Sequence, residues 1–392
     1  TGDQQLVKRI NRSVLMRLLR ATPGLSRAQL AGQSGLTKST VSLLVRELIE
    51  EGWLAEAQVA ASASLGRPST PLRIDTTRRG LIGVEIAVDV LRVVAVSLIG
   101  EVGWSMEAPV ASTQPLKICQ QTARLVRLAH RDMSARGVDL CGVGVGLPGA
   151  FDDLTGVVRF APNLGWRNVD FLPLLTRALK AAGVPDVPVQ VQNEADTAAL
   201  SEYEFAGGDS QDALIFVSCD VGVGAGIVLN DRLFTGVQGM AGEIGHSILQ
   251  VDGPPCSCGR RGCAETFIGA RALARAGSNH GGLALAGNYL GVLLQNLWTT
   301  FDPKLIVVGG ASCVLHPELV ELARTALPPG VETGLRMDPE TPRITGHYEP
   351  LRRAFSNLLR NAKDATPSGG EVLVSTLREG AAVVLRVPRG NC

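Results

Sequence analysis

The chain has 392 residues, of which 45% are hydrophobic and 19% are charged, and its net charge is +1. This length allows two or three domains with substantial cores and excludes a single small module. No run of about 18 consecutive apolar residues is present, and the N-terminal stretch is amphipathic and basic, unlike a secretory signal. We therefore expect a cytoplasmic protein that does not interact with a membrane.

The charge is unevenly distributed along the chain. Residues 1–80 hold 12 Lys and Arg against 6 Asp and Glu, a net charge of +6, whereas the remaining residues have a net charge of −5. A basic N-terminal region on a mildly acidic body modestly favours a nucleic acid as partner, although many solvated helices carry a similar excess.

The N-terminal region predicts three helices. Apolar residues recur at helical spacing from Asn11 to Leu19, and Pro23 ends this first helix. A second helix begins after Ser26 and ends at Gly35, and a third begins after Thr37, since Ser and Thr are good N-caps. The residues expected to face inward on the third helix are Val41, Leu44, Val45 and Leu48. Two short helices joined by a tight glycine turn are typical of a helix-turn-helix.

The outward residues of the third helix are small, polar or basic, and such groups can reach base edges and phosphates in a major groove. They are Lys38, Ser39, Thr40, Ser42 and Arg46. The segments WLAEAQVA and TPLRID then predict two strands around a flexible loop that carries Arg67, which completes a winged helix. The alternative is a helical dimerisation or linker domain with a polar face.

Beyond Arg79, glycine-rich strands alternate with helices. LIGVEIAV and VLRVVAVSLIG predict a strand pair, QQTARLVRLAHRDMSARG a helix, and CGVGVGLPGAF a strand that ends in a turn. The cycle recurs with ALIFVSCDVGVGAGIVLNDRLF and DPKLIVVGGAS. This repetition predicts an α/β body of two lobes with a ligand cleft between them.

Three segments of the body suit ligand binding. The glycines of residues 220–226 could admit a phosphate to the backbone or could simply permit a tight hairpin. Residues 162–166, PNLGW, offer an amide and an aromatic surface to a sugar. Asn193 and Glu194 follow a predicted strand, where paired amide and carboxylate groups bind vicinal hydroxyls well, although Asn193 could instead cap the next helix.

One histidine and three cysteines are concentrated between Glu243 and Glu265, in a loop rich in glycine and proline. The four residues are His246, Cys256, Cys258 and Cys263. Imidazole and thiolate groups at this spacing are typical zinc ligands, and the glycines allow the backbone to wrap round one ion. Ordinary buried thiols are the alternative, and a disulfide framework is disfavoured because eight cysteines are few for this length.

These motifs resemble those of the ROK family (repressor, open reading frame, kinase), and in particular its winged-helix, xylose-repressor-like members. The resemblance covers residues 5 to about 329. It rests on LTKSTVSLLVRELIEEGWL with the following GRP, LPGAFDDLTGVVRFAPNLGW, VQNEADTAAL, DVGVGAGIVLNDRLFTGVQGMAGEIGH and CSCGRRGCAET. It implies an α/β fold in which a winged helix-turn-helix precedes a two-lobed body of the actin-like, sugar-kinase-like type.

The resemblance also implies a function. It indicates a sugar-responsive repressor that binds double-stranded operator DNA as a homodimer or homotetramer, with xylose or another pentose or hexose as effector. The sugar-binding residues that it implies are Asn163, Asn193, Glu194, Glu243, His246 and Glu265. It further implies a structural zinc ion, held by His246 and the three cysteines, that fixes the loop carrying the histidine.

Two departures from the kinase members of the family predict that the protein is not an enzyme. Where kinases have a glycine-containing phosphate loop, residues 85–89 read Glu-Ile-Ala-Val-Asp, whose side chains would block a phosphate. Glu194 stands where kinases have a catalytic Asp, and its longer side chain would displace the carboxylate. An ATP-dependent sugar kinase remains the alternative function.

The predicted domains are a winged helix over residues 1–79, a sugar-binding body over 80–329 and an atypical segment over 330–392. We expect only residues 271–282 to separate the metal-ligand loop from the strand of DPKLIVVGGAS. The last segment resembles the start of a histidine-kinase ATP-binding domain, with Asn357 and Asn361 on its helix. The alternative is an amphipathic helix and a hairpin that complete the second lobe.

Overall fold

The computed structural model describes residues 4–57, 70–205, 213–276, 280–316, 318–324, 375–379 and 382–386. The chain divides into two units, Thr1–Ala323 and Arg324–Cys392. Within the described residues, no helix is both long and apolar enough to cross a lipid bilayer.

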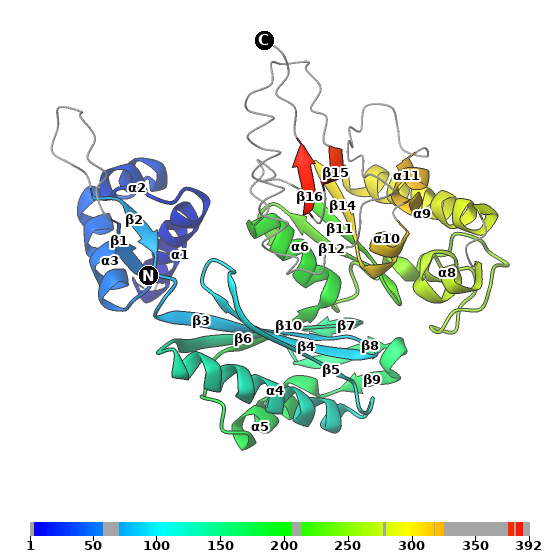
Figure 1. The fold of residues 1–392 in the computed structure, drawn as a ribbon, viewed down its shortest axis with the longest axis horizontal. Helices are drawn as coiled ribbons and strands as arrows, with labels where there is room; N and C mark the ends of the chain where they lie inside the picture. The colour runs from blue at the N-terminus through cyan, green and yellow to red at the C-terminus, as the bar shows by residue number, and fades with distance from the viewer. Residues whose placement is uncertain are drawn as a thin grey trace, which may run out of the picture. The chain divides into compact units, whose positions relative to one another are not determined.

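The N-terminal part of the first unit is a three-helix domain with a small sheet, here called the head (Figure 1). Its elements are α1 (Gln4–Ala21), α2 (Arg27–Ser34), α3 (Lys38–Glu50), β1 (Leu54–Glu56) and β2 (Leu72–Ile74). Ser26 caps α2 through the backbone N of Gln29, and Gly35, with φ of 70°, ends it. Thr37 caps α3 through the backbone N of Thr40. The predicted inward residues of α3 are at most 3% exposed, and the head has a hydrophobic core of its own.

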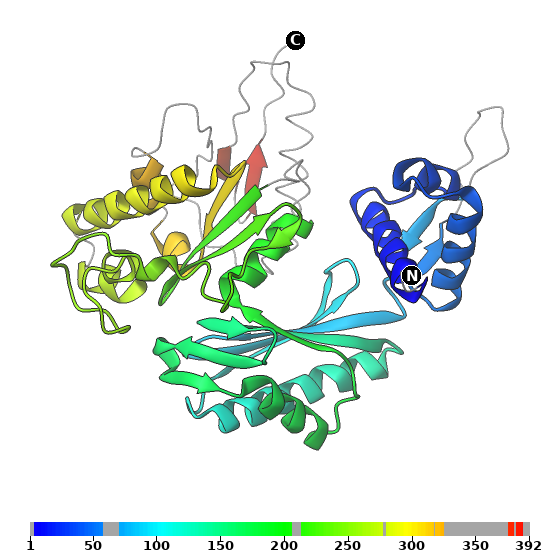
Figure 2. The ribbon, with the colours of Figure 1, turned by 180° about the vertical axis from the view of Figure 1, so that it is seen from behind.

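The first lobe of the body contains a five-stranded sheet and a smaller three-stranded one. Their elements are β3 (Arg79–Ile86), β4 (Val90–Ser97), β5 (Val102–Pro109), α4 (Pro115–Ala135), β6 (Asp139–Leu147), β7 (Ala150–Asp152), β8 (Val157–Ala161), η1 (Pro162–Leu164), β9 (Trp166–Val169), α5 (Phe171–Ala181) and β10 (Val189–Asn193). The large sheet has the order β10-β6-β3-β4-β5, and β3 pairs antiparallel with β4, as predicted. Helices α4 and α5 cover one face of this sheet (Figure 2). Buried aliphatic side chains between these layers form its core.

The second lobe repeats part of this pattern. Its elements are α6 (Glu194–Phe205), β11 (Ala213–Cys219), β12 (Val223–Leu229), β13 (Arg232–Leu233), η2 (Ile244–His246), α7 (Glu265–Ile268), α8 (Ala270–Ala276), α9 (His280–Phe301), β14 (Leu305–Gly309), α10 (Ala311–Leu315) and α11 (Glu318–Arg324). Strand β11 pairs antiparallel with β12 and parallel with β14, just as β3 pairs antiparallel with β4 and parallel with β6. The predicted repetition is therefore present in the strand pairing.

Helix α9 corrects one expectation. Only residues 271–282 were expected between the metal-ligand loop and β14, but α9 has 22 residues and continues to Phe301. The prediction was wrong because apolar residues occur nearly all round this helix, so the sequence shows no clear polar face. Leu290 and Leu293, for example, are buried in the lobe.

The second unit is described in two short strands, β15 (Ser375–Glu379) and β16 (Ala382–Arg386), which pair antiparallel. A hairpin was part of the alternative interpretation of this segment. Asn357 and Asn361 lie outside the described residues, so the resemblance to a histidine-kinase domain stays a prediction.

Candidate functional site

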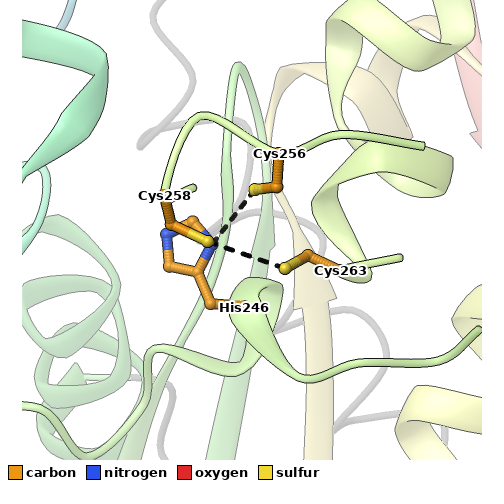
Figure 3. Close-up of side chains that lie close together, drawn as sticks. All are labelled: His246, Cys256, Cys258 and Cys263. Atoms are coloured by element: carbon orange, nitrogen blue, oxygen red, sulfur yellow. Dashed lines mark hydrogen bonds between the residues drawn. The ribbon is translucent and has the colours of Figure 1, made fainter. Parts of the chain in front are cut away.

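The four predicted metal ligands lie close together in the second lobe (Figure 3). His246 ends η2, and the cysteine loop is closed by a bridge between Ile248 and Cys263. Nδ1 of His246 lies 3.5 Å from Sγ of Cys256, and Sγ of Cys258 lies 3.7 Å from Sγ of Cys263. The candidate ligand atoms all lie within 4.8 Å of one another. The tertiary structure thus gathers the side chains that the spacing predicted.

The dimensions of this cluster suit a tetrahedral zinc ion. Zinc–thiolate bonds of about 2.3 Å correspond to ligand–ligand distances of about 3.8 Å in a tetrahedron. Three thiolates and one imidazole form a closed set of four ligands, which is typical of a structural metal. The loop is tight as well: Gly262 has a φ of 70°, and an added Cβ there would lie 1.6 Å from the carbonyl oxygen of Gln250. The residues therefore fit the metal that the motif implied.

The imidazole of His246 lies between this cluster and the carboxylate of Glu243. Its Nδ1 faces Cys256, whereas its Nε2 lies 3.9 Å from Oε2 of Glu243. The side chain is 6% exposed, and burial lowers its pKa, which favours the neutral ring. A neutral imidazole can bind a metal through one nitrogen and donate a hydrogen bond from the other.

Gly222, in the turn between β11 and β12, has two predicted sugar ligands packed against it. A Cβ added to Gly222 would lie 2.8 Å from Oε2 of Glu265 and 3.3 Å from Nδ2 of Asn163. Ser257 donates a hydrogen bond of 3.3 Å to Oε1 of Glu265, which ties this carboxylate to the metal-ligand loop. An amide from the first lobe and a carboxylate from the second thus both lie against this glycine.

The glycines that follow have a packing role. Gly226 lies in β12 against α6, where an added Cβ would lie 2.2 Å from the carbonyl oxygen of Ala195. Gly224 lies beside the same helix, and an added Cβ would lie 3.5 Å from Cβ of Ala195. These contacts favour the hairpin interpretation of the glycine-rich stretch over the phosphate interpretation.

Asn193 uses both ends of its amide within the protein. Its Oδ1 accepts a hydrogen bond of 2.7 Å from the backbone N of Ala195, and its Nδ2 donates one of 2.9 Å to the carbonyl of Gly149. The side chain therefore caps α6, as the alternative interpretation held, and ties that helix to the turn after β6. Direct contact between Asn193 and a sugar stays a prediction.

Glu194, the first residue of α6, has several carboxylates as neighbours. Burial, and after it the carboxylates of Asp220, Glu85 and Glu243, raise its pKa to about 8. Burial and the nearby Glu265 raise the pKa of Glu243 to about 7. Crowded carboxyl groups of this kind accept hydrogen bonds readily from a ligand rich in hydroxyls.

The described DNA-reading candidates lie on the first turns of α3. Lys38, Ser39, Ser42 and Arg46 are exposed and Thr40 is partly exposed. Arg46 lies 3.9 Å from Glu50, in an ion pair that is open to solvent and therefore weak enough to rearrange toward DNA. Arg67 lies outside the described residues.

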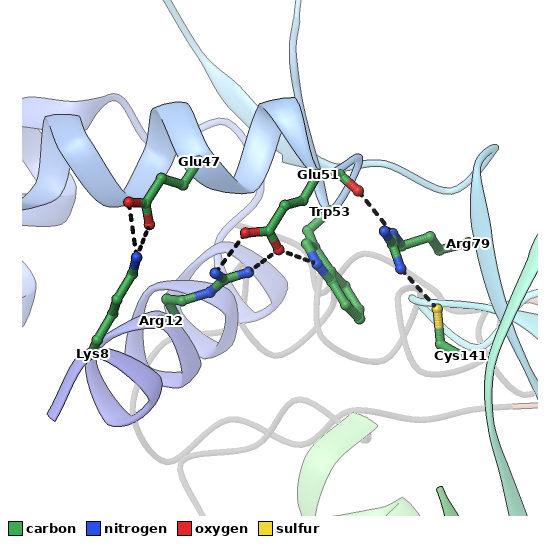
Figure 4. A network of polar contacts seen from close by, with 7 residues as sticks. All are labelled: Lys8, Arg12, Glu47, Glu51, Trp53, Arg79 and Cys141. Atoms are coloured by element: carbon green, nitrogen blue, oxygen red, sulfur yellow. Dashed lines mark hydrogen bonds and ion pairs between the residues drawn. The ribbon is translucent and has the colours of Figure 1, made fainter. Parts of the chain in front are cut away.

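Arg79, the first residue of β3, joins the head to the first lobe (Figure 4). Its Nε donates a hydrogen bond of 2.9 Å to the carbonyl of Glu51, and its guanidinium lies 4.6 Å from the ring centroid of Trp53. Its NH1 group lies 3.6 Å from Sγ of Cys141 in β6. The Glu51 carboxylate accepts hydrogen bonds from Arg12 of α1 and from the Trp53 indole. This network, here called the joint, was not predicted.

The sequence analysis did not indicate two further carboxylates near Glu194, those of Asp220 and Asp196. Asp220 accepts hydrogen bonds from the Ser218 hydroxyl at 2.8 Å and from the backbone N of Ala311, the first residue of α10. Asp196 is a buried residue in the first turn of α6. A carboxylate directly after a buried strand, as Asp220 is, was an available signal.

Known sequences and structures agree with this architecture. The profile described as "ROK family" matches residues 81–286, more than half of the chain. The chain belongs to the ROK family. A second profile, "Winged helix-turn-helix DNA-binding", matches residues 9–55, so this ROK protein carries the predicted head. Neither match extends beyond residue 286.

Individual ROK relatives cover most of the first unit. The xylose repressor of Bacillus subtilis (strain 168) is 29% identical over 348 residues, which cover 83% of this chain and 88% of the relative. The crystal structure of a ROK family transcriptional regulator, a homologue of the Escherichia coli MLC protein, has a TM-score of 0.67 at 24% identity and covers 82% of this chain and 89% of its own. A ROK glucokinase from Streptomyces griseus, solved with glucose and AMPPNP, has a TM-score of 0.53 at 26% identity and covers 63% of this chain and 88% of its own.

Proposed function

We propose that this protein is a sugar-responsive transcriptional repressor that acts in the cytoplasm. One observation carries the proposal: a single unit combines an exposed polar and basic face on α3 with a site where Asn163 and Glu265 both lie against Gly222. A protein named xylose repressor is similar to this chain, with coverage of 83% of the chain. Xylose is accordingly the first effector to test, followed by other pentoses and hexoses.

In this proposal the head binds double-stranded operator DNA. Lys38 and Arg46 supply positive charge and hydrogen-bond donors to phosphates or guanine edges, while the hydroxyls on the same face contact neighbouring groups. These hydroxyls belong to Ser39, Thr40 and Ser42. Arg67 in the wing adds a backbone or minor-groove contact. Two heads of a homodimer, or of a homotetramer, read the two halves of a palindromic site.

The sugar lies in the cleft with its hydroxyls on the carboxylates. Glu194, Glu243 and Glu265 accept hydrogen bonds, Asn163 offers an amide, and Nε2 of His246 donates. Asn193 acts by holding the start of α6 in place, through its bonds to Ala195 and Gly149. A zinc ion on His246, Cys256, Cys258 and Cys263 would supply rigidity to the loop that carries the histidine.

The joint provides a route from the cleft to the head. Strand β3 begins at Arg79, in the joint, and its residue Glu85 contributes to the electrostatic environment of Glu194 in the cleft. Strand β6 passes from Cys141 toward Leu147, two residues before the Gly149 that Asn193 holds. A sugar that binds one arrangement of the lobes better than another would shift the heads, with a coupling of about 1–3 kcal/mol.

The test is operator binding by the full chain with and without sugar. Duplexes selected from a random pool by the protein itself serve as operator, and fluorescence anisotropy measures affinity. We expect one pentose or hexose to weaken binding by roughly 5- to 150-fold, the range of typical allosteric coupling. Asn163→Ala should bind the operator normally but lose the response, whereas Lys38→Ala should lose affinity with or without sugar. Operator binding that ignores every sugar would contradict the proposal.

A ROK sugar kinase is the second candidate. It is favoured by the likeness to the Streptomyces griseus glucokinase and by a carboxylate, Glu194, at the predicted base position. A coupled assay of ATP consumption with glucose, xylose and other sugars decides between the two. Sugar-dependent turnover that disappears in Glu194→Ala would favour the kinase. A nucleotide-binding role for residues 330–392 would require ATP binding that is lost when this segment is deleted.

A further inference from the structure

A group of ion pairs joins the first helix of the head to the second lobe of the body. Arg17 and Arg20 lie one turn apart on α1, and both pair with the carboxylate of Glu204 in the last turn of α6. The Arg17 pair spans 3.9 Å, and the side chain of Glu204 is 23% exposed. The two helices are separated by more than 170 residues of chain, so only the folded chain creates this contact, here called the latch.

Helix α6 carries the latch at one end and two sugar-binding candidates at the other. Glu194 is its first residue, and the Asn193 side chain caps it by accepting a hydrogen bond from the backbone N of Ala195. A helix of 12 residues is about 18 Å long and moves as a rigid element. A ligand that displaces the start of α6 would therefore also displace Glu204.

Helix α1 is tied in turn to α3, which carries the DNA-reading candidates. Leu19 of α1 is buried in the core of the head. Lys8 pairs with Glu47 of α3 at 2.8 Å, and Arg12 pairs with Glu51, the C-cap of α3. These cations of α1 thus divide between two partners, α3 for the first half of the helix and α6 for the end of it.

The head is consequently held by both lobes. The joint connects it to the first lobe through Arg79, and the latch connects it to the second lobe through Glu204. When the lobes move relative to each other, the two contacts cannot both stay as they are. The head must then either turn or give up one of them.

We propose that the latch couples the sugar site to the DNA-reading helix. Sugar binding at the start of α6 changes the pairing of Glu204 with Arg17 and Arg20, and this change reorients α1 together with α3. The inference rests on the proposed function and names the contact through which the sugar regulates DNA binding.

Two simpler roles for these charges predict different results. Partly exposed ion pairs contribute little to stability, so a merely structural latch would leave the effect of sugar unchanged. Charges that act directly on DNA would change operator affinity by the same factor with and without sugar. Only a coupling role changes the ratio of the two affinities, here called the sugar response.

The experiment measures the sugar response of the full chain by fluorescence anisotropy on operator duplexes selected by the wild-type protein. Xylose, arabinose and glucose are tested at saturation, and the sugar with the largest effect on wild type is used for the variants. Glu204→Gln removes the charge but keeps the shape, and it should reduce the sugar response by about fivefold, the upper range for a partly exposed ion pair. Asp186→Asn removes the same charge from an exposed loop before β10 and should leave the response unchanged.

Reversal of the charges provides an internal test. Arg20→Glu and Glu204→Arg should each reduce the sugar response, and the double variant should restore it to within about twofold of wild type. Arg17→Gln should have a smaller effect than Arg20→Gln, because the Arg17 side chain is 56% exposed and that of Arg20 only 27%. If Glu204→Gln does not fold, the combination of these two glutamine variants removes the same ion pairs.

The possible failures are distinguishable. A sugar response of folded Glu204→Gln within about 1.5-fold of wild type would overturn the inference alone, whether or not operator affinity itself changes. Failure of the charge-reversed double variant to recover the response would also overturn it, and both results leave the proposed function standing. A wild-type protein that responds to no sugar in the panel would overturn the sugar control in the proposed function together with the inference.

Discussion

The head and the cleft use charged groups in opposite ways. In the head, cations and anions meet: Lys8 pairs with Glu47 and Arg12 with Glu51, and the bond from Arg12 is the main reason that the pKa of Glu51 is lowered. In the cleft, carboxylates face one another, and the pKa of Glu194 is raised. These charges of the head are paired within the protein, whereas the crowded carboxyl groups around Glu194 require protons or a ligand.

The two regions also differ in how their functional residues come together. The described DNA-reading candidates occupy a single helix with a local cap, and the head has its own core. The sugar-binding candidates lie in η1, β10, α6, η2 with its cap Glu243, and α7, which are separated by up to about 100 residues of chain. A substitution far from both regions should therefore weaken sugar binding more than it disturbs the structure of the head.

The largest expected effect is the loss of the metal when its cysteine ligands are replaced. Replacing Cys256 and Cys263 with serine should reduce bound zinc from about one ion per chain to almost none, as measured by elemental analysis. The loss of a structural metal should lower the melting temperature by about 6–12 °C, corresponding to about 3 kcal/mol. Ser257→Ala, in the same loop, should keep its zinc. A wild-type protein that is folded and equally stable without metal would contradict this prediction.

The second effect tests the contrast in charge directly. Because the folded-state pKa of Glu194 is raised from 4.5 to about 8, the folded state binds the extra proton, and stability should fall as pH rises from about 5 to 8. Glu194→Gln removes this loss and should be more stable than wild type at pH 8 by roughly 1–3 kcal/mol, with little difference at pH 4. Urea unfolding at several pH values measures this difference in the free energy of unfolding between the variant and wild type.

Glu51→Gln, in the head, should show the opposite dependence of stability on pH in the same urea-unfolding experiment. The pKa of Glu51 is lowered, so its contribution should be present at neutral pH and lost as pH falls below the ordinary range of a glutamate. The variant should therefore be less stable than wild type at pH 7, and the difference should shrink at pH 4. Parallel pH profiles for the two glutamine variants would show that head and cleft do not differ electrostatically.

The third effect concerns the joint between the two regions. Arg79→Ala removes a hydrogen bond to the Glu51 carbonyl and the contact with Trp53. We expect sugar affinity and operator affinity each to change by less than about threefold, but the effect of sugar on operator binding to fall by roughly 5- to 10-fold. Arg136→Ala, which breaks an exposed pair with Asp132 on α4, serves as the control. An unchanged sugar response would exclude the joint from the coupling.

The smallest effect concerns the head alone. Thr37→Ala removes the N-cap of α3 and should lower stability by about 1 kcal/mol, with a matching loss of operator affinity. Ser42→Ala, on the exposed face of the same helix, should leave stability unchanged. Sugar binding should be unaffected in both variants, as calorimetry would show, because the head has its own core.

Much of this architecture could be read from the amino-acid sequence. The caps Ser26 and Thr37, the inward positions of α3 and the Cys/His spacing are local signals, because each depends on residues a few positions apart. Helix α9 was not predicted because this local signal is absent there: its apolar residues show no one-sided pattern. The predicted DNA contact of Arg67 and the predicted nature of residues 330–392 stay predictions.

The tertiary structure decided which groups lack partners. The sequence indicated Glu194, Glu243 and Glu265, but it could not show that Asp196 is buried near them. Nor could it show that the Asn193 amide forms hydrogen bonds with Ala195 and Gly149. It could not show the joint either, because Arg79 and Glu51 are ordinary charged residues until the strand and helix ends meet. Local signals specify elements and short loops, whereas burial and the pairing of charges depend on contacts between distant segments, which only the folded chain determines.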